Sequence, residues 1–308
     1  MRPTLAGPLL LAVLSSGCLS IPRADPAPGR DELLTQDVVV RILEESRQPP
    51  QDPLAVMNGL ERLLPSWQSA QRRGRAAPIE RELVRKVVVN FDVVADMLQN
   101  GPHERRLVAA WALGFAQVPD NDEGLESPHA QALALLMAVL DDSPDDLTRN
   151  ALLGIWKLSD PATPMRPLAD LVVNHHDADV RANACLALGA VLTEESAPAA
   201  IEPLLVALSD TEPKVRLHAA DIARQWPSPA LTTQIEGAVQ TEDTPLVLAA
   251  MLRALGSAGS TRSAPLLMYL LESPREVVAE SAHLALVDLY GVDHGPLRAD
   301  WLEFVEDL

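Results

Sequence analysis

The stretch DADVRANACLALGAVL, residues 177–192, decides the fold of this chain. Apolar or small residues follow Val180 at offsets 4, 7, 8 and 11, which puts all of them on one stripe of an α-helix. Offsets 4 and 7 hold Ala184 and Ala187, and side chains this small let a neighbouring helix approach closely. We therefore predict that both alanines are structural positions at a helix–helix contact.

The pattern occurs six times, with copies that start at Arg105, Leu147, Val180, Val215, Val247 and Val278. The steps between the starts are 42, 33, 35, 32 and 31 residues, and a period of about 20–50 residues is typical of a solenoid. Each period has room for two helices. Apolar spacing places the first helix of three periods at 165–174, 200–210 and 263–273. The sequence thus predicts an all-α fold, an α-solenoid of about six antiparallel helix pairs.

The composition fits this fold and excludes one class of partner. Of the 308 residues, 47% are apolar but only 3% are aromatic, so Ala, Leu and Val must fill the core through close helix contacts. The formal net charge is −18, from 25 basic and 43 acidic residues. Because a protein that coats nucleic acid needs the opposite sign, we expect no nucleic-acid partner.

Both ends of the repeat region carry further helical patterns. Residues 31–47 and 53–67 have helical apolar spacing, and residues 79–98 are predicted to form one helix that pairs with the first copy. At the far end, one helix face would hold the apolar residues Trp301, Phe304, Val305 and Leu308. This is the arrangement a terminal cap needs, with its apolar side inward and its charged side outward.

Residues 177–192 resemble the bacterial HEAT repeat, especially the short type related to phycobilisome-lyase repeats. The signature Asp-x-x-Val-Arg-x-x-Ala-x-x-Ala-Leu-Gly matches from Asp177 to Gly189, and the resemblance extends over about residues 79–290. In that family the arginine after the valine pairs with an acidic residue of a neighbouring repeat. The resemblance therefore implies structural roles for Arg181 and Arg216. Three of the six copies lack this arginine, and the slot holds Arg106, Thr148, Arg181, Arg216, Leu248 and Ala279.

Residues 1–18, MRPTLAGPLLLAVLSSGC, resemble a bacterial lipoprotein signal peptide. Arg2 would supply the positive start, residues 9–14 the short apolar core, and the run from Leu14 to Cys18 the lipobox. The resemblance implies cleavage before Cys18, a diacylglycerol on its thiol and a fatty acyl chain such as palmitate on the new amino terminus. The sequence departs from the commonest lipobox because its leucine lies four residues before the cysteine. An ordinary signal peptide with a chance cysteine and a cytoplasmic start remain alternatives.

The segment after Cys18 is rich in proline, which disfavours helix and favours extended chain. Leu19, where inner-membrane lipoproteins carry aspartate, resembles the outer-membrane sorting state, so we expect the periplasmic face of the outer membrane and other envelope proteins as partners. The predicted organisation is a signal peptide (1–18), a tether (19–30), an N-terminal helical cap (31–78), HEAT-like repeats (79–290) and a C-terminal capping helix (291–308).

Motifs for chemistry are few. The sequence contains no Walker-type loop, dinucleotide fingerprint or nucleophile elbow. Di-iron HEAT enzymes use repeated His-Glu pairs, but His103-Glu104 is a single pair. His175 and His176 stand beside Asp177 and Asp179, which makes a metal site conceivable, although an exposed polar turn is the favoured interpretation. Cys185, on an apolar helix face, is interpreted as a buried small hydrophobe. We predict no catalytic residue, no metal and no cofactor apart from the lipid on Cys18.

The favoured function is a non-enzymatic, membrane-anchored scaffold or adaptor for protein interactions, because solenoids expose long surfaces rather than closed pockets. Alternatives are an enzyme or cofactor-attachment subunit of the bilin-lyase or metal-dependent HEAT type, and a purely structural spacer. The 42-residue first step leaves extra residues in the loop at 118–128, where insertions project without disturbing a stack. Its acidic residues are the candidate partner contacts: Asp120, Asp122, Glu123 and Glu126.

Overall fold

The computed structural model describes residues 36–47, 51–118, 127–141 and 143–306. Within these ranges every regular element is a helix. The signal peptide with Cys18, the tether, and the acidic residues Asp120, Asp122, Glu123 and Glu126 lie outside the described residues, so the statements about them remain predictions.

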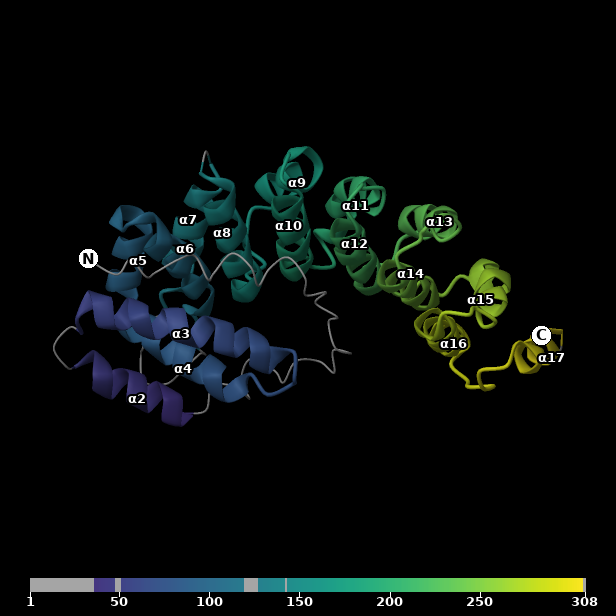
Figure 1. Cartoon of the computed structure of the whole chain (residues 1–308), viewed down its shortest axis with the longest axis horizontal. Helices are drawn as coiled ribbons and strands as arrows, with labels where there is room; N and C mark the ends of the chain where they lie inside the picture. The colour runs from purple at the N-terminus through teal and green to yellow at the C-terminus, as the bar shows by residue number, and fades with distance from the viewer. Residues whose placement is uncertain (1–35, 48–50, 119–126, 142, 307–308) are drawn as a thin grey trace, which may run out of the picture.

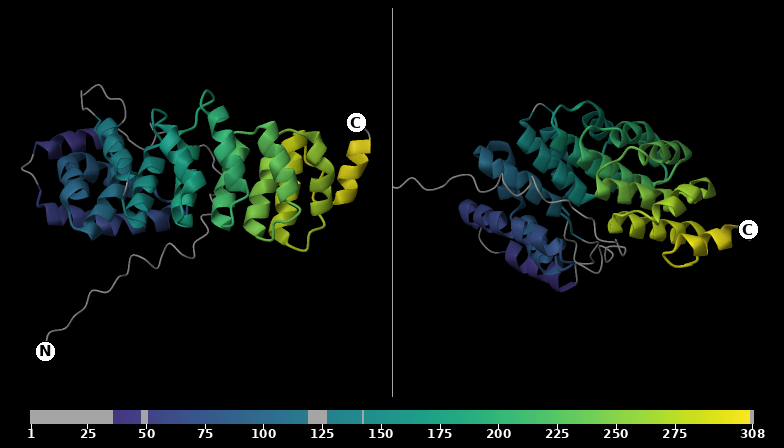
Figure 2. Two further views of the ribbon diagram at one scale, coloured as in Figure 1. Left: turned by 90° about the horizontal axis from the view of Figure 1, so that it is seen from above. Right: turned by 45° about the vertical axis from the view of Figure 1, so that its right-hand side comes forward.

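The predicted solenoid of antiparallel helix pairs is confirmed. The first helices of the pairs are α5 (Phe91–Asn100), α7 (His129–Val139), α9 (Met165–Asn174), α11 (Ile201–Leu208), α13 (Pro229–Ala238) and α15 (Ala264–Leu270). The second helices are α6 (His103–Ala112), α8 (Asp145–Leu158), α10 (Ala178–Val191), α12 (Pro213–Gln225), α14 (Pro245–Ser257) and α16 (Glu276–Tyr290). Figures 1 and 2 show the pairs stacked into a curved array, with α9, α11, α13 and α15 on the outer row and α10, α12, α14 and α16 on the inner row.

The prediction of one helix over residues 79–98 is wrong. The segment forms two helices, α4 (Ala77–Val89) and α5, separated at Asn90. The Asn90 side chain donates a hydrogen bond to the Lys86 carbonyl at 2.9 Å. The backbone carbonyl of Asn90 accepts a hydrogen bond from the Val94 amide. A side chain that competes for backbone groups in this way favours a helix boundary. α5 alone therefore serves as the first helix of the first pair.

Helices at both ends complete the stack. α2 (Gln36–Ser46), α3 (Pro53–Gln71) and α4 lie at the N-terminal end, and α17 (Arg298–Glu306) lies beyond α16 (Figure 1). On α17, Trp301 is fully buried and its indole nitrogen donates to the Gly295 carbonyl at 2.7 Å. The ring of Tyr290 on α16 packs against Trp301 and Phe304. The apolar side of this last helix therefore closes the end of the core.

Small residues hold the second helices close to one another. Ala184 and Ala187 are fully buried. A methyl group added at Gly256 on α14 would lie 2.6 Å from both the Cα and the carbonyl oxygen of Ala285 on α16. A methyl added at Gly154 on α8 would lie 2.6 Å from the carbonyl oxygen of Ala110 on α6. At these points one helix backbone touches the next, and no larger side chain fits without moving a helix.

Replacing Gly256 by alanine tests this contact. We expect Gly256→Ala to lower the free energy of unfolding by about 1–3 kcal/mol, because the new methyl group overpacks a backbone contact. The matched control is Gly237→Ala on α13, where an added methyl group has no atom within 4 Å. That change should stabilise the protein by up to about 1 kcal/mol, since alanine is the better helix former. Urea unfolding measures both, and shifts of the same sign and size would contradict the account.

Candidate functional site

Two arginines link successive repeats by the same geometry. Arg181 on α10 donates from Nε and Nη2 to the Asp210 carboxylate, at 2.7 and 2.9 Å, and from Nη1 to the carbonyls of His175 and His176, at 3.0 Å each. Arg216 on α12 does the same one repeat later, with the Glu242 carboxylate and the carbonyls of Asp210 and Thr211. In the first copy, Arg106 donates instead to the Leu98 carbonyl at 2.9 Å. Paired hydrogen bonds of this kind fix the turn before each helix as well as the spacing of the repeats.

A second repeating position faces the inner side of the solenoid. Offset 6 from each repeat start lies across the helix from the buried stripe. In the first copy this position is Trp111, which contacts Trp67 on α3, and α3 lies along the inner side of the array in Figure 1. Along the stack this position holds Trp111, Leu153, Leu186, Asp221, Arg253 and Leu284. A mostly apolar row therefore follows the inner side, and a carboxylate and a guanidinium on adjacent helices interrupt it.

The N-terminal helices cover the first part of this row. Trp67 on α3 packs edge-on against Trp111 and Phe115, with ring centroids 6.3 and 5.1 Å apart, and also contacts Trp156. Its indole nitrogen donates to Glu80 of α4 at 2.9 Å, and Glu80 pairs with Lys157 of α8 at 2.6 Å. In Figure 1 no described helix covers the inner side of α12 and α14 in this way.

The charged interruption on α12 and α14 is incompletely paired. Asp221 is only 7% exposed, and its Oδ1 lies 4.0 Å from Arg253 Nη2, which is beyond ordinary hydrogen-bond length. The buried Nε atoms of Arg224 and Arg253 have no hydrogen-bond partner among the described residues. Burial raises the pKa of Asp221, against the opposing charges of Arg253 and Arg224. Buried donors without acceptors cost free energy, so this pair of helices carries a destabilising polar contact.

His218 on α12 lies one turn before Asp221, and one of its ring nitrogens also lacks a hydrogen-bond partner among the described residues. It is 8% exposed, and its Nδ1 has no hydrogen-bond partner in the described part of the chain. Burial lowers the pKa of His218 to about 4, and the nearby charge of Lys214 adds to the effect. The imidazole is therefore neutral at neutral pH, and α12 carries two buried polar side chains, His218 and Asp221, one turn apart.

The low pKa of His218 makes stability depend on pH. Between about pH 6.5 and pH 4 the unfolded chain binds a proton at this histidine and the folded chain does not, so stability falls as the pH falls. Relative to His218→Asn, we expect wild type to lose up to about 3 kcal/mol of unfolding free energy across this window. Urea unfolding at a series of pH values measures the difference, in which other titrating groups cancel. Parallel curves for the two proteins would show that the histidine is not held neutral.

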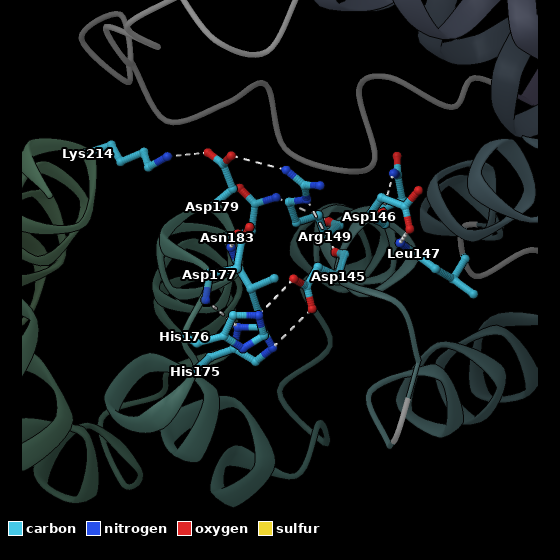
Figure 3. A network of polar contacts seen from close by, with 12 residues as sticks. Asp145, Asp146, Leu147, Arg149, His175, His176, Asp177, Asp179, Asn183 and Lys214 are labelled. Carbon is cyan, nitrogen blue, oxygen red and sulfur yellow. Dashed lines mark hydrogen bonds and ion pairs between the residues drawn. The ribbon is translucent and has the colours of Figure 1, made fainter. Parts of the chain in front are cut away.

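A third polar cluster joins two repeats on their turns (Figure 3). Asp145 is the first residue of α8, and His175 and His176 form the turn between α9 and α10. The Nε2 atoms of His175 and His176 lie 3.8 and 3.0 Å from Asp145 Oδ1 and Oδ2, respectively. The two imidazole rings stack with centroids 4.6 Å apart and an angle of 24° between planes. One potential ligand atom from each of the three residues lies within 4.8 Å of the others.

The acidic residues beside these histidines in the sequence, Asp177 and Asp179, contact other groups in the structure. Asp177 caps α10 by accepting from the Val180 amide at 2.9 Å, while its own amide donates to His175 Nδ1 at 3.1 Å. Asp179 pairs with Arg149 and Lys214. The carboxylate that meets both imidazoles therefore comes from Asp145, thirty residues earlier, and only the stacking of two repeats brings it there.

The remaining candidates of the sequence show no catalytic arrangement. His103 Nε2 lies 2.7 Å from Asp146 Oδ2. Cys185 is fully buried, and burial raises the pKa of its thiol. A pocket of about 300 Å³ lies between the start of α13 and the end of α14, and its one charged lining residue, Arg262, pairs with Glu236. Its lining therefore offers no pair of acid and base groups.

Comparison with known proteins finds a family match for part of the chain. Residues 201–287 match the family model of HEAT repeats. Among solved structures, human deoxyhypusine hydroxylase in complex with glycerol aligns with 19% identity over 83% of this chain and 97% of that one, with a TM-score of 0.38. A designed armadillo repeat protein in complex with a (KR)4 peptide aligns with 18% identity over 81% and 98%, with a TM-score of 0.44. Both likenesses are too low to bear on function. No curated protein sequence matches the chain.

Proposed function

We propose that this chain is a membrane-anchored scaffold or adaptor for protein interactions in the bacterial cell envelope, without enzymatic activity of its own. The observation that carries the interaction role is the inner row beyond α8, where apolar side chains flank the unpaired donors of Arg224 and Arg253. A row of half-buried apolar and charged side chains, on a rigid stack of helices, is the kind of surface that repeat proteins use for binding.

The chain's own N-terminal helices indicate what this surface accepts. Trp67 places an aromatic ring on the apolar part of the inner row, and Glu80 supplies a carboxylate to the adjacent Lys157. In the uncovered part, Leu186 and Leu284 lie on either side of Asp221 and Arg253, so apolar positions again flank a cation. The partner we infer is a protein segment with apolar side chains around a carboxylate, which would pair with the exposed part of the Arg253 guanidinium.

Charge reversal at Arg253 tests the binding surface. We expect Arg253→Glu to lose at least one protein that wild type captures by crosslinking in cells, because the change repels a carboxylate-bearing partner. The matched control is Arg73→Glu, which makes the same charge change at an exposed position in the turn after α3. Circular dichroism would establish that both variants fold.

A third variant separates the inner row from the acidic loop, in which residues 119–127 are replaced by a short Gly-Ser turn. Loss of the captured proteins with this variant alone would move the contact to Asp120, Asp122, Glu123 and Glu126. An unchanged set of captured proteins in all three variants would favour the structural spacer.

The anchor rests on the lipobox-like run before Cys18 and on the proline-rich tether after it. Among the helices of the described ranges, none has the length and apolar character needed to cross a bilayer. A lipid on Cys18, placed at the periplasmic face of the outer membrane by the Leu19 sorting position, would supply membrane attachment.

Cysteine replacement tests the anchor. We expect Cys18→Ala to abolish labelling by a fatty-acid analogue and to release the protein from the membrane fraction, because the thiol is the site of attachment. Cys185→Ala is the matched control, since this buried cysteine should not affect labelling. Labelling that persists in Cys18→Ala would overturn the lipoprotein assignment.

No feature of the described residues specifically favours the alternative of an enzyme or cofactor-attachment subunit of the bilin-lyase or metal-dependent HEAT type. The three-residue cluster at Asp145 lies on surface turns, away from the pocket between α13 and α14. We therefore propose no enzymatic activity on the basis of the HEAT-repeat subtype.

A further inference from the structure

We propose that Asp145, His175 and His176 bind one divalent transition-metal ion, with Zn²⁺ as the representative, and that the ion joins the α7–α8 repeat to the α9–α10 repeat. The proposal is independent of the membrane anchor and of the inner row. It rests on the convergence of two imidazoles and one carboxylate from turns of adjacent repeats (Figure 3).

The donor set and its spacing fit such an ion. Two imidazole nitrogens and one carboxylate oxygen suit Zn²⁺, Ni²⁺ or Cu²⁺ better than Ca²⁺ or Mg²⁺, which prefer oxygen ligands. Tetrahedral Zn²⁺ with bonds of about 2.0–2.1 Å holds its ligand atoms about 3.3 Å apart. The distances from His175 Nε2 to Asp145 Oδ1 and from His176 Nε2 to Asp145 Oδ2, 3.8 and 3.0 Å, lie on either side of that value. The three potential ligand atoms lie within 4.8 Å of one another, and side-chain rotations would bring them to the spacing that the ion requires.

Hydrogen bonding leaves part of this arrangement unexplained. The 3.8 Å separation at His175 is too long for a hydrogen bond, yet both Nε2 atoms are directed at the same carboxylate. The neighbouring arginines and lysine are engaged elsewhere: Arg149 and Lys214 pair with Asp179, and Arg181 pairs with Asp210. Among the described residues, only the two histidines form ion pairs with the Asp145 carboxylate, so no arginine or lysine occupies the place where the ion would bind.

The turn that carries the histidines is already held in place. Arg181 donates to the carbonyls of both His175 and His176, and Asp177 caps the helix that follows. Ligands fixed before binding lose less conformational entropy when the ion arrives. The same arginine that spaces the repeats therefore also positions the two imidazoles.

One contact must change when the ion binds. Ligation through His175 Nε2 puts the proton of a neutral imidazole on Nδ1, where the Asp177 amide now donates. The Asp177 amide would lose this acceptor, and the Asp177 carboxylate, whose charge already interacts with His175, would accept the Nδ1 proton, in the manner of other metal-bound histidines. The His176 side chain is 79% exposed, so the ion exchanges with solvent and its fourth position is open to water or to a ligand from a partner.

Zinc titration of the full chain tests the proposal. The protein is prepared without a histidine tag and with Cys18→Ser, so that neither a tag nor that thiol competes for the ion. Isothermal titration calorimetry with Zn²⁺ should show one ion per chain. His176→Ala and Asp145→Asn should each weaken binding by more than about tenfold, since changes even beyond the ligands reach that size.

The matched control is His103→Ala, which removes a histidine that contacts the adjacent Asp146 without a third ligand. It should bind Zn²⁺ as wild type does. Zinc should also raise the melting temperature of wild type and of the control but not of His176→Ala, and circular dichroism without zinc verifies folding of each variant. Absence of stoichiometric binding, or equal binding by wild type and His176→Ala, would overturn the proposal.

Discussion

Contact between the backbones of successive second helices is the constraint on which the rest of the structure depends. Gly256 on α14 and Ala285 on α16 approach so closely that one added methyl group would lie 2.6 Å from backbone atoms. Ala184 and Ala187 on α10 are fully buried for the same reason. Small residues fill offsets 4 and 7 in most repeats, with Ile222 and Met251 as exceptions, so the second helices stack as a row that sets the repeat spacing.

The two polar features of functional interest are consequences of this stacking. The row brings Asp221 on α12 beside Arg253 on α14, on the inner side and away from the apolar seam. At the turns, Arg181 holds the backbone of His175 and His176, and stacking of the preceding repeat brings Asp145 to the same place. The apolar seam and these polar groups thus occupy different sides of the same helices.

Much of the fold was predictable, because helical periodicity and a constant repeat length are properties of the sequence itself. Residues 165–174 form α9 as expected, whereas the break at Asn90 depends on one side-chain hydrogen bond that periodicity does not reveal. The candidate sites were harder to predict from the sequence. Asp221 and Arg253 share one repeat offset and could have been found by comparing copies, but Asp145 meets His175 and His176 only through the packing of two repeats. The roles of Cys18 and the acidic loop remain predictions.

Amide hydrogen exchange of the wild-type chain tests the central claim most directly, because it reports the local stability of every helix. If the row of second helices holds the solenoid together, amides in α10, α12 and α14 should exchange more slowly than those in α9, α11 and α13. Each of α10, α12 and α14 packs between two other second helices as well as against its own first helix. Equal protection of both rows, or slower exchange in the outer row, would contradict the account.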